Sequence, residues 1–137
     1  MRISVITVSY NSAATIVDTV ESVLAQTGVN LEYIVMDGGS TDATLEKLAP
    51  YREAIDILVS EPDAGMYDAM NKGIARASGE VVAILNSDDI YADAQVLARV
   101  VEQFYGSEVD CLYGDRWIAS SAMLRKPLSK LKQLGGA

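Results

Sequence analysis

Two acids at the end of an apolar run are the residues of this sequence most able to do chemistry. Residues 81–85 are apolar, and Asn86, Ser87, Asp88 and Asp89 follow them directly. A short apolar run of this kind predicts a buried strand, and ligands of open α/β sheets bind where such strands end. Carboxylate, amide and hydroxyl oxygens packed this closely suit a divalent cation that carries substrate phosphates.

Polar residues also follow the other expected strands, at residues 7–11, 37–42 and 61–65. Each segment alone is weak evidence, but four of them along one rim predict a binding site. The Asp37-Gly38-Gly39 segment has two interpretations. Its carboxylate could accept hydrogen bonds from a base or a ribose, or it could organise a tight turn and cap the next helix.

The elements that must position these residues alternate along the chain. Strand-like and helix-like patterns in β-α order predict an α/β fold, with a mostly parallel central sheet and helices on both faces. We expect one domain over residues 1–116, followed by a basic segment at 117–137. The expected strands are residues 3–8, 31–36, 55–59, 81–85 and 109–113, and the expected helices are 13–24, 42–48, 66–77 and 96–104.

Composition narrows the possible partners. The net charge of −8 over 137 residues argues against nucleic acid, which requires a basic face. The segment 116–137 nevertheless holds five basic residues and no acid. This segment could contact an anionic membrane surface or a lipid-linked acceptor. Alternatively, it is a solvated tail that packs on a more C-terminal part of the protein. We expect a cytoplasmic protein, with peripheral contact at the inner face of the cell membrane as an option, and Cys111 as a reduced core residue.

The sequence lacks the motifs and residues that several common enzyme classes require. It has no GxGxxG after the first strand and no GxxxxGK[ST], which excludes the dinucleotide fingerprint and the P-loop. It has 0 histidines, which excludes Ser-His-Asp hydrolysis and a histidine-ligated zinc ion.

Taken together, four segments resemble the family-two glycosyltransferases, which have the GT-A, Rossmann-like nucleotide-binding fold. The segments are residues 7–11, 37–42, 65–73 and 79–89, and the resemblance covers nearly all of residues 1–116. It implies an inverting enzyme that moves a sugar from a UDP- or GDP-sugar to a glycan or lipid-linked acceptor, as in polysaccharide biosynthesis.

The resemblance also implies roles for individual residues. Asp37 would hydrogen-bond the base, and Asp88, with Asp89, would bind Mg²⁺ or Mn²⁺. Asn86 stands where the family carries the first acid of its DXD metal motif, so the two following acids must supply the charge. The donor-binding residues that it implies are Thr7, Tyr10, Asn11, Asp37, Asn71, Lys72, Ser87 and Asp88.

An inverting displacement needs a carboxylate to deprotonate the acceptor hydroxyl. In the family that base lies in a later, acceptor-side segment, and Asp115 is the only late acid here. The leading hypothesis is therefore a donor-binding portion truncated before its catalytic base. Alternatives are a nucleotide-sugar-binding module without turnover, a metal-dependent nucleotidyltransferase and a receiver-type signalling domain. The last is disfavoured because no acidic pair follows the first strand.

Overall fold

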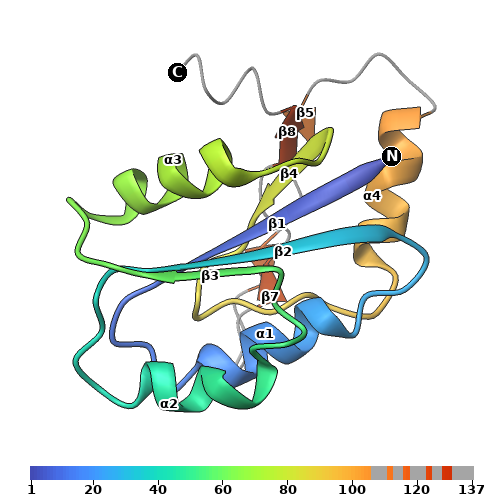
Figure 1. Cartoon of the computed structure of the whole chain (residues 1–137). Coiled ribbons are helices and arrows are strands. Elements are labelled where there is room, and N and C mark those ends of the chain that lie inside the picture. Colours follow the sequence, from blue (N-terminus) through green and yellow to red (C-terminus); the bar gives the residue numbers. More distant parts are fainter. Residues whose placement is uncertain (106–110, 113–115, 118–122, 125–127, 131–137) are drawn as a thin grey trace.

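The computed structural model describes residues 1–105 and the short strands at 111–112, 116–117, 123–124 and 128–130. Strands and helices alternate as expected through the first of these ranges (Figure 1). In chain order the elements are β1 (Arg2–Ser9), α1 (Ile16–Leu24), β2 (Asn30–Asp37), α2 (Thr44–Leu48), the 3₁₀ turn η1 (Ala49–Tyr51), β3 (Ile57–Ser60), α3 (Met66–Arg76), β4 (Val81–Ile84), α4 (Val96–Tyr105), β5 (Cys111–Leu112), β6 (Arg116–Trp117), β7 (Met123–Leu124) and β8 (Leu128–Lys130).

The main sheet has the strand order β3-β2-β1-β4-β8-β5. Its first four strands are parallel, and the register places Ser9 beside Asp37 and Asp37 beside Ser60. The carboxyl ends of these strands therefore meet at one edge of the sheet. This arrangement confirms the predicted parallel α/β architecture of the GT-A class.

Helices cover both faces of the parallel strands. The side chains of β1 alternate between the two faces, since Ile3 and Val5 pack in one buried cluster and Ile6 and Val8 in the other. The first cluster includes residues of α1, α2 and α4, while α3 covers the second face (Figure 1). Burial of apolar surface on both faces, worth roughly 25 cal/mol per Å², fixes the sheet between its helices.

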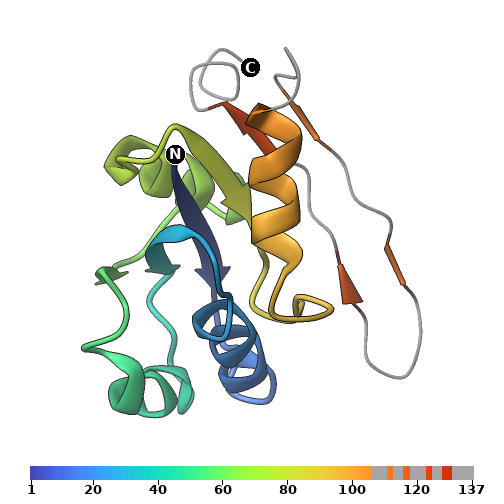
Figure 2. The same ribbon diagram turned by 90° about the vertical axis from the view of Figure 1, so that its right-hand side faces the viewer.

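Strand β8 was not predicted. It pairs antiparallel with β4 and with β5, so part of the basic segment joins the same sheet as β1. Strands β6 and β7 form a separate two-stranded sheet (Figure 2). The expected strand at 109–113 is described only at Cys111–Leu112, and Asp115 lies outside the described residues. Within the described part of the chain, no helix is long and apolar enough to cross a membrane.

Helix α1 begins later than the sequence indicated. The sequence predicted a helix over residues 13–24, but the helix starts at Ile16 and receives no side-chain cap. The Ser12 hydroxyl instead lies 2.6 Å from the hydroxyl of Ser87, after β4. The residues between β1 and α1 are therefore free to form the wall of a cavity.

Candidate functional site

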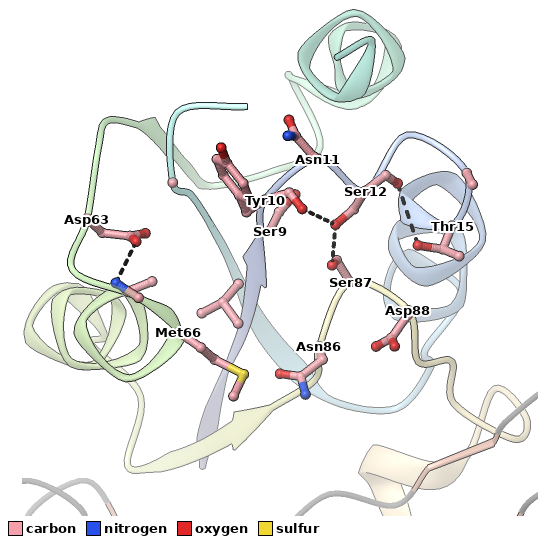
Figure 3. A pocket seen from close by; sticks show the side chains of 15 residues that line it. Ser9, Tyr10, Asn11, Ser12, Thr15, Asp63, Met66, Asn86, Ser87 and Asp88 are labelled. Carbon is pink, nitrogen blue, oxygen red and sulfur yellow. Dashed lines mark hydrogen bonds between the residues drawn. The ribbon is translucent and has the colours of Figure 1, made fainter. Parts of the chain in front are cut away.

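A cavity of about 800 Å³ opens at the carboxyl edge of the parallel strands. Its walls come from segments 8–15, 63–69 and 86–88 (Figure 3), and Gly38 also lines it. Ligand pockets of proteins commonly enclose about 300–1,000 Å³. The four polar strand ends of the sequence thus meet around one space large enough for a small-molecule ligand.

The loop after β4 supplies the acidic end of this cavity. Asp88 is exposed and lines the space, whereas Ser87 is held by its contact with Ser12. The buried hydroxyl of Thr19 lies 2.9 Å from the carbonyl oxygen of Ser87 and 2.7 Å from that of Asp89. These contacts hold the loop on α1 with the Asp88 carboxylate facing the cavity.

Asp89 occupies a different place from Asp88. Its side chain is 2% exposed, and it is not among the residues that line the cavity. Among the described residues no three His, Cys, Asp or Glu side chains converge as a metal-binding group. Asp88 is therefore the carboxylate that the β4 loop presents to a ligand, and a role for Asp89 as a metal ligand stays a prediction.

Two buried oxygen atoms of the cavity wall have no hydrogen-bond partner among the described residues. They are Oγ of Ser9 and Oδ1 of Asn86. Leaving a buried polar atom unpaired costs about 1–3 kcal/mol. A polar ligand in the cavity would remove that cost, so both atoms indicate a binding site.

Asn11 shapes the opposite wall. Its backbone has φ 48°, the left-handed region that asparagine tolerates better than most residues. Its Oδ1 accepts hydrogen bonds from the backbone N–H groups of Thr41, at 2.8 Å, and Asp42, at 3.3 Å. The side chain expected to line the nucleoside pocket thus also ties the loop after β2 to the loop after β1.

We expect Asn11→Ala to lower the free energy of unfolding by about 1–3 kcal/mol, because it strains the backbone and frees two N–H groups. Asn11→Asp keeps an acceptor oxygen and tolerates the same φ, so it should retain most of the stability. Urea denaturation of the three proteins measures the differences. Equal stability of the alanine variant and the wild type would show that this tie does not support the loop.

Thr7 and Asp37, which the resemblance implied as donor-binding residues, are not among the described residues that line the cavity. Thr7 is 0% exposed, and its hydroxyl pairs with the hydroxyl of Tyr33 at 2.8 Å. It lies on the same sheet face as Val5, inside the core, and so does not reach a nucleoside at the sheet edge.

The Asp37 carboxylate is 2% exposed and accepts four hydrogen bonds. The donors are the N–H groups of Gly39 and Ser40 and the hydroxyls of Ser40 and Ser60, at 2.6–3.1 Å. Of the two interpretations of this segment, the structure shows the organised turn.

Asn71 and Lys72 lie on α3, outside the residues that line the cavity. The Lys72 ammonium is 3.3 Å from the Asp68 carboxylate and 3.5 Å from that of Glu61. Desolvation lowers the pKa of Lys72, but these two carboxylates raise it, and the net shift is upward. In this conformation the Lys72 charge is directed at α3 and the loop after β3.

Sequence reasoning assigned no role to Asp63, which lines the cavity beside Gly38 and Gly65. Its Oδ1 accepts the N–H of Gly65 at 2.9 Å (Figure 3). A Cβ atom added to Gly38 would lie 2.7 Å from Oδ2 of Asp63, so a side chain at this position would make the carboxylate move from its present place. The sequence did contain a signal that could have identified Asp63, because this acid follows the third strand in the same way that Asp88 follows the fourth.

A parallel sheet with helices on both faces and a polar cavity at its carboxyl edge places this chain among the open α/β folds that bind ligands at the ends of their strands. The sequence comparison identifies the family. A model of glycosyl transferase family 2 matches residues 4–134, and the chain belongs to that family.

Individual relatives agree with this assignment. An uncharacterized glycosyltransferase of Mycobacterium tuberculosis is 43% identical over 105 residues, which are 76% of this chain and 40% of that protein. The chain therefore spans less than half the length of that relative.

Solved structures share the fold. S. aureus TarS in complex with UDP-GlcNAc has a TM-score of 0.75 at 26% identity, over 88% of this chain and 38% of that one. The mannosyltransferase PcManGT from Pyrobaculum calidifontis, in complex with GDP-Man and Mn²⁺, has a TM-score of 0.82 at 22% identity, over 97% and 46%. At that identity the second likeness supports the fold alone.

Proposed function

We propose that this chain is the donor-binding part of an inverting glycosyltransferase that takes a nucleoside-diphosphate sugar into the cavity at the carboxyl edge of the sheet. The main support for this proposal is the position of Asp88. Its exposed carboxylate lies at one end of a polar cavity, on a loop that contacts with α1 hold in place. The UDP-GlcNAc seen with TarS, which is 26% identical, supports this ligand class. A glycan or lipid-linked molecule is the proposed acceptor.

The residues of the β4 loop fit a bound Mg²⁺ or Mn²⁺. Mg²⁺ in phosphate-handling sites is usually held by one or two carboxylates, with water and substrate phosphates completing its shell. Asp88 supplies such a carboxylate, and the unpartnered Oδ1 of Asn86 supplies a neutral oxygen on the same loop. When bound, the metal would neutralise the charge that develops on the leaving diphosphate.

The chain's own residues account for binding on the donor side. Among the described residues that line the cavity none is a lysine or an arginine, and a metal ion would supply the positive charge that a diphosphate requires there. The acceptor hydroxyl must lose a proton to a base, and Asp115 stays a prediction for that role.

Isothermal titration calorimetry with UDP and GDP tests this proposal. We expect at least one of them to bind, and EDTA to weaken that binding about tenfold or more, because the described part of the cavity wall has no cationic side chain. UMP and GMP should bind more weakly, since they lack the β-phosphate that the metal would share. Failure of both diphosphates to bind in Mn²⁺ would contradict the proposal. A transfer assay with labelled sugar nucleotides then separates an enzyme from a binding module without turnover.

A further inference from the structure

Among the described residues that line the cavity, Asp63 and Asp88 are the two that carry a carboxylate. They lie at different ends of it, Asp88 on the β4 loop and Asp63 on the loop between β3 and α3 (Figure 3). This inference rests on the proposed function, in which the diphosphate of the donor lies at the Asp88 end of the cavity. The nucleoside then extends toward Gly38, Tyr10 and Asp63.

We propose that Asp63 reads the base of the donor nucleotide and selects guanine. Asp37 is unsuited to that task, because its carboxylate is buried and already accepts four hydrogen bonds. Asp63 has one oxygen held by the Gly65 N–H, while Oδ2 has no hydrogen-bond donor among the described residues and projects over Gly38. The backbone thus fixes the carboxylate and leaves an acceptor facing the cavity.

The identity of the base follows from hydrogen-bond chemistry. An ionised carboxylate only accepts hydrogen bonds. Guanine presents two adjacent donors on one edge, N1–H and the N2 amino group, which match the two oxygens of a carboxylate. Uracil presents a single N–H between two carbonyl oxygens, and those oxygens would face the negative charge of Asp63. A site built on a carboxylate therefore favours guanine.

The surroundings of Asp63 suit a flat purine. Gly38 has no side chain to obstruct a ring that approaches the carboxylate, and substitution there would displace Asp63. The Tyr10 ring is 61% exposed and belongs to the cavity wall, so one face of it is available for stacking. Together these residues form a base subsite in which stacking is unselective and Asp63 provides the selection.

Competition calorimetry in Mn²⁺ with GDP, IDP, UDP and XDP tests the proposal. The wild type should bind GDP about tenfold more tightly than UDP, with IDP between them because inosine lacks the N2 amino group. Asp63→Asn replaces one acceptor with a donor, so it should lose affinity for GDP about tenfold or more and gain affinity for XDP, whose C2 carbonyl can accept from the new amide. Glu61→Gln is the matched control, since Glu61 is an exposed neighbour outside the cavity wall.

The possible results separate this inference from the proposed function. The role of Asp63 is overturned if the wild type binds UDP more tightly than GDP, or if folded Asp63→Asn ranks the affinities of the four nucleotides as the wild type does. Either result leaves the proposed donor site intact. Absence of binding by every nucleoside diphosphate overturns both. The order of nucleotide affinities of the wild type is measured without any variant, so the proposal is tested even if Asp63→Asn is unstable.

Discussion

Asp88→Ala is expected to abolish the metal dependence of nucleoside diphosphate binding and to lower the affinity in Mn²⁺ by about 100-fold. Loss of residues that merely support a metal ligand costs about 10- to 100-fold, and loss of a ligand should reach at least the upper end. Asp88 is the one acid of the β4 loop that lines the cavity, so none of the other lining residues of that loop can replace its charge. The fold should survive, because the side chain is exposed.

The measurement is calorimetry of the preferred diphosphate with the wild type and the variant, each in Mn²⁺ and in EDTA. The variant should give the same weak affinity in both buffers. Glu102→Gln serves as the control, because it removes an exposed acid of α4 that is not among the lining residues. Unchanged binding by Asp88→Ala would show that the metal, or the nucleotide, binds elsewhere.

Much of this site could be predicted because strand ends are visible in the sequence. Apolar runs locate the strands, the β-α order makes them parallel, and parallel strands bring their carboxyl ends to one edge. The segments that contain Tyr10, Asn11, Ser87 and Asp88 were located in this way, the resemblance implied the individual residues, and all four line the cavity. The positions of loops along the sheet were thus predictable without knowledge of side-chain direction.

Side-chain direction was the part that could not be predicted. Strand β1 is buried on both faces, so its pattern does not show that Thr7 points into the core toward Tyr33. The partners of Asp37 include Ser60, 23 residues away, which only the paired strands bring near. Strand β8 was missed for a related reason, since its antiparallel pairing with β4 is a contact between distant parts of the chain.

A glycine at the opposite edge of the sheet, where the parallel strands begin, allows a second mutational test with a large expected effect, because the structure leaves no space for a side chain there. Gly79 precedes β4, and its N–H donates to the Ser4 hydroxyl at 2.8 Å. That hydroxyl donates in turn to the buried carboxylate of Glu32 at 2.7 Å, and Ser78 donates to the same carboxylate from its N–H and its hydroxyl, at 2.8 and 2.9 Å. This network joins β1, β2 and the start of β4.

Protonation of Glu32 should matter to stability. Burial raises the pKa of Glu32, but the hydrogen bonds from Ser78 and Ser4 and the charge of Arg2 lower it, and the net shift is below the ordinary value of 4.5. A carboxyl whose pKa is lowered by folding stabilises the folded state above its unfolded pKa. That contribution disappears as the pH falls through the folded-state pKa.

Gly79→Ala is expected to lower the free energy of unfolding by about 2–4 kcal/mol. The added Cβ would lie 2.6 Å from the Ser4 hydroxyl, 2.8 Å from the Ser4 backbone nitrogen and 2.9 Å from the Arg2 carbonyl oxygen. Two of these atoms belong to the backbone of β1, so the strands must separate and the network around Glu32 must break.

Urea denaturation at neutral pH measures the loss, and Glu80→Ala, an exposed neighbour, should change stability by less than about 0.5 kcal/mol. Repeating the measurement as the pH is lowered below 4.5 gives a second test, because the wild type should progressively lose the contribution of Glu32 there while the variant has already lost much of it. The gap between the two proteins should therefore narrow in acid. A variant as stable as the wild type, or a gap independent of pH, would show that β4 approaches β1 less closely than this glycine requires.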